Sequence, residues 1–553
     1  MLTSIIGVVI LLGGLIFFHE LGHYSVAKFF KVKVEIFSLG FGKKIFSRQI
    51  GETQYCLSLI PFGGYVKLMG DDPYKGVPAH EAERAFCTQK LYKRFLIVAA
   101  GPISNLLLAY VLFSIVFFVG QPMVATRIGT VAVHSLAWEA GFRSKDTLLE
   151  IDGKKVGNWH EFEEMVKPKL GQKIEVKVER DKTELKIFVE VAKVRGKNAY
   201  GEDVEVGGIK GLNPNPLEPV VGISDPKSLV YLAGLRTGDT ITKIEGTPIL
   251  VFGDIHEALN SVWKEKKAIV IHFKRKPTPE AKEVPEQTVS LVLPKLSKDS
   301  LDLGVGTLLG IYPSEMFVRQ LSPGSPAEKG GLKVGDRVVS LGDKPVHSFE
   351  EIVDYVQGQG AKGEAAKIIV DREGQSVALN LKTMEIQQED PISNQKVKKH
   401  MIGLSPWAIY HEPDYVIFQI REPIALVNRA IYETNDLAKK MVVSLAKLAM
   451  GKISVKNLGG PVLIASVAGK SLDAGIIPFL QMMALISINL FLLNLFPIPV
   501  LDGGHLLFFF LEAIKGKPVS VKTMEIANQI GMIFVLMLVG LTLFNDITRI
   551  VLH

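Results

Sequence analysis

An uncharged apolar run from Ile5 to Phe18 leads directly into His19-Glu20-Leu21-Gly22-His23. On a helix, two histidines four residues apart project from one face, so both imidazoles can bind one zinc ion. Glu20 is then placed to act as a general base beside the metal. A signal peptide or simple anchor is the competing interpretation, but the run has neither a basic n-region nor a cleavage site. Two histidines and a glutamate at the end of a membrane helix are costly without a role, so we favour metal binding.

The chain has 553 residues, of which 47% are hydrophobic, and this composition predicts a multi-pass membrane protein. Four segments are long and apolar enough to span a bilayer, and we expect them at 1–24, 94–120, 475–503 and 526–546. Polar residues inside these segments, such as Ser104, Asn105 and Ser487, should face neighbouring helices. The net charge is +7, but its lysines cluster in loops and no nucleic-acid motif is present. We therefore exclude a nucleic-acid partner and expect the lipid bilayer instead.

The loop at 25–93 carries many lysines and arginines close to the membrane, which indicates a cytoplasmic location by the positive-inside rule. The long segment from about 121 to 474 then lies on the outer side. Within the loop, residues 31–37 and 53–59 alternate between polar and apolar types, which predicts a small β-sheet that ends at Pro61-Phe62-Gly63-Gly64. This sheet is either a plain connector or an edge for an unwound substrate.

One phrase recurs three times in the outer segment, at 140–146, 233–239 and 330–336, each time ending in aspartate. A short strand, a turn, a helical pattern and alternating strands follow each copy, at roughly 95 residues per unit. The units resemble PDZ domains, in which a helix and a strand flank a peptide groove. We expect them at 124–213, 220–296 and 302–384. Three in a row favour recognition or size filtering of substrates over a role as structural spacers.

Apolar residues recur at helical spacing within 415–452, with lysines and arginines on the flanks. This pattern predicts an amphipathic helix on the membrane surface, with an ordinary core helix as the alternative.

The third apolar segment ends in Asn494-Leu495-Phe496-Pro497-Ile498-Pro499-Val500-Leu501-Asp502-Gly503-Gly504-His505. Its prolines prevent a regular helix and place a carboxylate at the end of a membrane segment. If Asp502 lies at the depth of the two histidines, two imidazoles and one carboxylate leave an open fourth position, as in catalytic zinc sites. We expect His505 to be an outer neighbour of the site, not a fourth ligand.

These motifs together resemble the site-2 protease family over nearly the whole chain. The resemblance implies a polytopic α-helical membrane protein with four transmembrane helices, a re-entrant β-sheet and inserted tandem PDZ-like α+β domains. It implies that His19, His23 and Asp502 bind Zn2+, that Glu20 is catalytic and that Asn494 positions the substrate. The number of PDZ-like units departs from the usual two.

The resemblance also implies a zinc-dependent intramembrane endopeptidase of the bacterial inner membrane. Its partners would be membrane-embedded single-pass proteins, such as anti-sigma factors or signal-peptide remnants, already cut by a site-1 protease. The PDZ-like units would lie in the periplasm and the active site toward the cytoplasm. Two other classes compete with this one. A zinc transporter would need neither the glutamate nor the repeats, and an inactive scaffold would leave the four polar residues in the membrane without a purpose.

Overall fold

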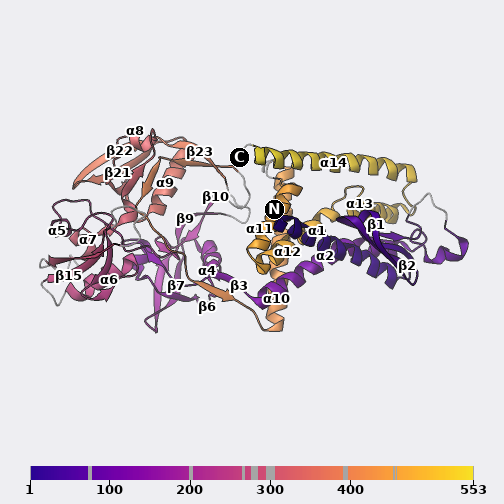
Figure 1. Ribbon diagram of the computed structural model, residues 1–553, viewed down its shortest axis with the longest axis horizontal. Helices are drawn as coiled ribbons and strands as arrows, with labels where there is room; N and C mark the ends of the chain where they lie inside the picture. The colour runs from indigo at the N-terminus through magenta and orange to yellow at the C-terminus, as the bar shows by residue number, and fades with distance from the viewer. Residues whose placement is uncertain are drawn as a thin grey trace. The chain divides into compact units, whose positions relative to one another are not determined.

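The computed structural model describes residues 2–71, 77–197, 203–263, 268–275, 284–293, 305–389, 396–451, 455 and 458–551 (Figure 1). The chain divides into two compact units. The first joins residues 1–121 with 419–553, and the second comprises residues 122–418.

Four helices of the first unit are long and apolar enough to cross a membrane: α1 (Leu2–Phe29), α2 (Leu91–Val119), α12 (Ile476–Leu495) and α14 (Val521–Val551). They confirm the four expected apolar segments. The third helix ends at Leu495, short of the expected limit at 503, because prolines follow at 497 and 499. Asp502 therefore opens a separate helix, α13 (Asp502–Lys515).

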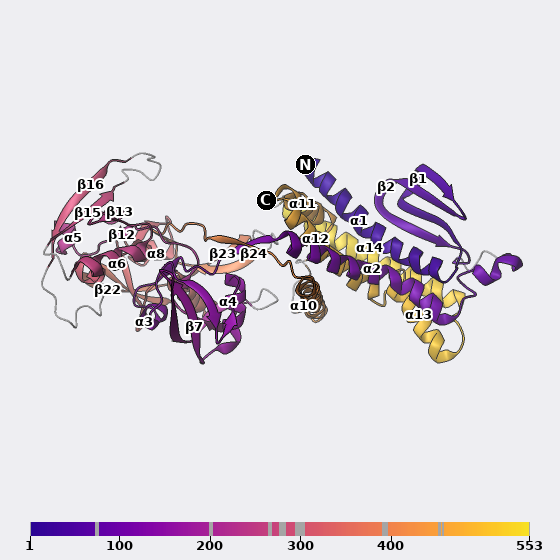
Figure 2. The ribbon, with the colours of Figure 1, turned by 90° about the horizontal axis from the view of Figure 1, so that it is seen from below.

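Two further helices belong to this unit. Helix α11 (Pro461–Asp473) packs on the first half of α1, where Gly7 lies against the backbone of Ala468. Helix α10 (Pro423–Ala449) lies across α2, as the two views in Figures 1 and 2 show. The expected helix at 415–452 is thus too long, because Tyr415–Phe418 forms strand β26, which pairs with β3 (Gln121–Val124). Glu422 caps α10 by accepting the N–H groups of the next turn.

Strands β1 (Val34–Ile50) and β2 (Thr53–Leu68) form a sheet beside α1 (Figure 2). Residues 34–39 pair with 54–57 on one side and 64–68 on the other, while 44–50 pair with 53–58. The sheet therefore has an edge at residues 64–68. Our expectation that the sheet ends at residues 61–64 is wrong, because Gly63, at φ 147°, turns the chain back into the sheet. The 3-10 helix η1 (Ala79–Arg84) follows.

The second unit contains the three repeats, and each has a four-stranded sheet of the same order: β6-β5-β7-β8, β14-β13-β15-β16 and β20-β19-β21-β22. In each repeat a short helix capped by a serine precedes the four-stranded sheet in the chain, and a longer helix lies between the second and third strands of the sheet. The elements of the first repeat are β4 (Thr130–Val131), α3 (Leu136–Ala140), β5 (Thr147–Ile151), β6 (Lys154–Lys155), α4 (Trp159–Val166), η2 (Lys167–Lys169), β7 (Lys173–Arg180), β8 (Thr183–Glu190), β9 (Ala192–Lys197), β10 (Asp203–Gly208) and β11 (Leu212–Asn213).

The second repeat contains β12 (Val221–Gly222), α5 (Leu229–Leu232), β13 (Thr240–Ile244), β14 (Thr247–Pro248), α6 (Phe252–Trp263), β15 (Ala268–Lys274), β16 (Glu286–Val292), α7 (Val305–Leu309) and β17 (Tyr312–Pro313). The third contains η4 (Ser314–Met316), β18 (Val318–Leu321), α8 (Pro326–Lys329), β19 (Arg337–Leu341), β20 (Lys344–Pro345), α9 (Phe349–Lys362), β21 (Ala366–Arg372), β22 (Gln375–Leu381), β23 (Met384–Glu389), β24 (Lys396–Met401) and β25 (Leu404–Pro406). Helix α7 packs in the core of the second repeat, and β25 pairs with β18. The expected limits at 296 and 302 lie outside the described residues.

The aspartate that ends each copy of the repeated phrase has the same structural role in all three repeats. Asp146, Asp239 and Asp336 are buried, and each accepts a 2.7 Å hydrogen bond at Oδ1 from the Nε atom of an arginine on the third strand or just after it. The three arginines, which also donate to a glycine carbonyl of the same phrase, are Arg180, Arg275 and Arg372. The repeated phrase therefore has a structural role: in each repeat its buried aspartate forms a charged hydrogen bond with an arginine.

Candidate metal centre

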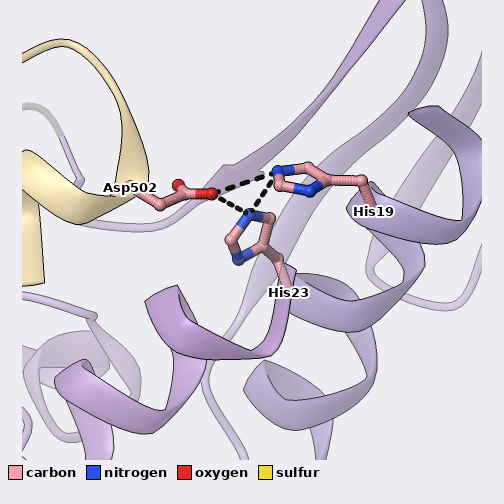
Figure 3. Close-up of side chains that lie close together, drawn as sticks. All are labelled: His19, His23 and Asp502. Carbon is pink, nitrogen blue, oxygen red and sulfur yellow. Dashed lines mark hydrogen bonds and ion pairs between the residues drawn. The ribbon is translucent and has the colours of Figure 1, made fainter. Parts of the chain in front are cut away.

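Helix α1 presents His19 and His23 on one face, four residues apart, and the first residue of α13 meets them (Figure 3). Asp502 Oδ2 lies 3.1 Å from His19 Nε2 and 3.5 Å from His23 Nε2. The two Nε2 atoms lie 3.2 Å apart. In the described part of the chain, these three residues form the only cluster of histidine, cysteine or acidic side chains close enough to hold one metal ion.

These distances suit zinc. With bonds of about 2.0 to 2.1 Å, ligand atoms at the corners of a tetrahedron lie about 3.3 Å apart. The three measured separations, 3.1, 3.2 and 3.5 Å, are close to that value on every edge. The donor set also fits, because two imidazoles and one carboxylate leave a fourth position for water or substrate.

The turn before Asp502 brings the carboxylate to the histidines. Val500 has a φ of 91°, which is strained for a β-branched residue. The chain then folds tightly on itself: a Cβ atom on Gly503 would lie 2.1 Å from the carbonyl oxygen of Phe496, and one on Gly504 would lie 2.6 Å from that of Ile498. The glycine pair after Asp502 is therefore required by the turn that positions the carboxylate.

Helix α2 forms the wall of the site behind the histidines. A Cβ atom on Gly101 would lie 2.2 Å from His23 Nε2 and 2.9 Å from His19 Cε1, so a side chain there would displace both rings. Gly22 on α1 has the matching role, since its Cβ atom would lie 2.2 Å from the carbonyl oxygen of Ala100. The two helices thus approach closely at the site because both lack side chains there.

Helix α2 also supplies polar partners to the two imidazoles. His23 Nδ1 lies 2.9 Å from the carbonyl oxygen of Ile97, and His19 Nδ1 lies 3.3 Å from the Asn105 amide. Ser104 donates to the carbonyl oxygen of Phe18 at 2.6 Å. The expectation that polar residues of this helix face their neighbours is confirmed.

Glu20 is not among the three clustered residues and turns toward β2 instead. The Val66 N–H donates to its carboxylate, and a Cβ atom on Gly64 would lie 3.2 Å from its Cγ. The side chain therefore lies between the histidine pair and the sheet edge at residues 64–68.

Asn494 and His505 lie outside the cluster. Asn494 occupies the last turn of α12, and His505 stands in the first turn of α13 with its ring beside Phe508. Sequence reasoning missed the wall formed by Gly101 and assigned no role at the site to Asn105. The Gly101-Pro102 interruption of the second apolar segment was the available signal for both.

The chain is similar to known proteins over nearly its whole length. The model of "Peptidase family M50" matches residues 7–538. The chain is 30% identical over 548 residues to "Regulator of sigma-E protease RseP" of Escherichia coli (strain K12), covering 98% of each chain. It is 29% identical over 554 residues to "Protease RseP" of Yersinia pestis, covering 99% of each chain. A "Putative zinc metalloprotease" of Vibrio cholerae serotype O1 is 29% identical over 552 residues, again covering 99% of each chain.

Among solved structures, a PDZ domain protein from Parabacteroides distasonis matches 47% of this chain and 97% of its own length. The identity is 9% and the TM-score is 0.12, which is too low to support an argument about the fold.

Proposed function

This chain belongs to peptidase family M50, and we propose that His19, His23 and Asp502 hold the zinc ion of an intramembrane endopeptidase in which Glu20 is the general base. The family and the relatives make the chain a site-2-type metalloprotease of regulated intramembrane proteolysis. The observation that carries the assignment of the ligands is the tetrahedral spacing of the three donor atoms.

The chemistry follows from where the side chains lie. A bound zinc ion supplies a Lewis acid and makes a water molecule acidic. Glu20, one residue after His19, takes a proton from the water that attacks the peptide carbonyl and returns it to the leaving nitrogen. Asn494, near the end of α12, is our candidate for holding the substrate backbone.

A substrate helix must unwind before its carbonyl groups can be attacked, because they are hydrogen-bonded within the helix. The sheet edge at residues 64–68 lies beside Glu20, and among the described residues no further strand pairs with it, so an extended segment could add to the sheet there. The same sheet exposes the large apolar side chains of Phe41, Ile45, Phe46 and Leu57, which supports a position dipping into the bilayer as a re-entrant element.

The substrates that we propose are transmembrane segments of single-pass membrane proteins, first shortened by a site-1 protease. Anti-sigma factors fit the relatives named as regulators of sigma-E, and signal-peptide remnants share the same chemistry. The repeats would lie on the periplasmic side, because the basic loop at 25–93 favours the cytoplasm, and would filter substrates there by size or by recognition. The active site would then face the cytoplasmic side of the inner membrane.

This function is tested by comparing membrane peptides from cells that make the wild-type protein with those from cells that make Glu20→Gln. We expect single-pass fragments without their outer domains to accumulate with the variant, as measured by mass spectrometry. Identical fragments in both strains, together with a change in cellular zinc content, would instead support a transporter.

A further inference from the structure

The Asn105 side chain of α2 is fully buried next to the first histidine. Its Nδ2 atom lies 3.3 Å from His19 Nδ1, and its Oδ1 atom has no hydrogen-bond partner. Its backbone is fixed as well, because the buried Ser487 of α12 donates to the Asn105 carbonyl oxygen at 2.7 Å. A buried amide with an unpaired oxygen is costly, which suggests a role beyond packing.

The two histidines set a chemical requirement for this position. An imidazole that binds a metal through Nε2 carries its proton on Nδ1, so Nδ1 needs an acceptor. His23 has one in the carbonyl oxygen of Ile97, 2.9 Å away. For His19, the group at Nδ1 is the Asn105 amide.

An amide can serve either tautomer of His19. With the nitrogen toward the ring, Nδ1 accepts, and the ring proton stays on Nε2, which lies 3.1 Å from Asp502 Oδ2. With the amide turned by half a rotation, Oδ1 accepts the Nδ1 proton and Nε2 is left as a free donor atom for zinc. The amide oxygen and the amide NH2 group are nearly the same size, so rotating the Asn105 amide needs no rearrangement of α2.

We propose that Asn105 is a positioning residue that holds His19 in the zinc-binding tautomer by accepting its Nδ1 proton. The inference rests on the proposed zinc site and extends it to α2. Helix α2 would thereby orient both imidazoles, one through a backbone carbonyl and the other through a side chain.

The test compares the zinc affinity of purified full-length variants, measured by competition with a chelator. Asn105→Leu keeps the volume but offers no acceptor, so we expect its zinc affinity to fall about 10- to 100-fold. Asn105→Asp offers an acceptor and should bind zinc nearly as tightly as wild type. A purely structural role predicts the opposite order, because a buried carboxylate is harder to accommodate than leucine.

Asn545→Leu provides a matched control. Asn545 is also a buried amide of the first unit, but it donates to the carbonyl oxygens of Val455 and Leu458, away from the metal centre. Its loss should leave zinc affinity unchanged. Wild-type affinity in Asn105→Leu, or equal loss in Asn105→Leu and Asn105→Asp, would overturn the proposal.

A second measurement needs no variant. In zinc-loaded wild-type protein labelled with 15N-histidine, the two signals that change on chelation should come from rings protonated at Nδ1. A ligand histidine protonated at Nε2 would overturn the inference about Asn105. Wild-type protein that binds no zinc at all would instead refute the proposed metal site, so the two failures are distinguishable.

Discussion

The Asp502 carboxylate lies 3.1 Å from His19 Nε2, although the two residues stand near opposite ends of the chain. The contact depends on α2, which packs against α1, α12 and α13. The proposed metal centre is therefore a product of the assembled helices, and changes in α2 should alter it without removing any of the three proposed ligands.

Gly101→Ala should abolish tight zinc binding, because the added Cβ would lie 2.2 Å from His23 Nε2. Zinc content of the purified protein measures this directly. Gly13→Ala on α1 is the matched control, since nothing lies within 4 Å of its Cβ position, and it should keep its zinc. Normal zinc content in Gly101→Ala would contradict the close packing described for α2.

Arg372→Ala should destabilise the third repeat by about 3 to 5 kcal/mol, because it leaves the Asp336 carboxylate buried without its cation. All four tryptophans of the chain lie in the second unit, so their fluorescence during urea unfolding of the full-length protein reports on this unit. Glu385→Ala removes an exposed ion pair with Lys398, which water and salt screen, so it should destabilise the protein much less. Equal losses of stability in the two variants would refute the structural role of the aspartate–arginine pair.

The second unit should lose stability as the pH falls from about 6.5 to about 4, because of His256 on α6. This ring is fully buried, neither nitrogen has a hydrogen-bond partner, and burial lowers its pKa to about 4. The unfolded chain, with the ordinary pKa near 6.5, therefore binds the proton first. Stability is complete above that window and falls by about 3 kcal/mol across it.

His256→Phe should flatten this pH dependence of the tryptophan-detected unfolding. The neighbours His134 and Arg143, which also lower the pKa of His256, are unchanged in this variant. His160→Gln alters an exposed histidine on α4 and should leave the slope as in wild type. A slope that persists in His256→Phe would assign the pH dependence to other groups.

If the repeats filter substrates, replacing Gly335 by valine should admit a substrate that still carries its outer domain. Gly335 has a φ of 90°, which valine cannot adopt without strain, so the turn of the third repeat should change. The cleavage rates of trimmed and intact substrates in membranes are compared for both enzymes. A higher cleavage rate of the intact substrate, without the same gain for the trimmed one, supports a filter. An equal loss of the cleavage rate for both substrates would show that the repeats support folding of the enzyme.

Much of the site could be predicted from the sequence because its spacing is local. His19 and His23 lie on one helix face by periodicity alone, and the prolines before Asp502 mark the end of a membrane segment. Their meeting could not be calculated from periodicity, because it depends on how α13 packs against α2. The resemblance to a family supplied that pairing.

The repeats show the same limit. The repeated phrase ending in aspartate revealed three similar units, but nothing local in the sequence assigns Arg372 as the partner of Asp336, since the pair forms only when β21 is in place. The length of the sheet at 34–68 is underestimated from the sequence for a related reason. Its edge strand follows a bend at Gly63. The sequence does not distinguish a bend within a sheet from the end of a sheet, because only the tertiary pairing of the strands decides between them.

We propose that His19, His23 and Asp502 hold zinc while Glu20 carries out proton transfer. The direct test measures zinc content and cleavage of a single-pass substrate for wild type, Glu20→Gln and Asp502→Ala, each purified and reconstituted in lipid vesicles. We predict that Glu20→Gln keeps one zinc ion and loses cleavage, whereas Asp502→Ala loses both. Cleavage by Glu20→Gln, or tightly held stoichiometric zinc in Asp502→Ala, would contradict it.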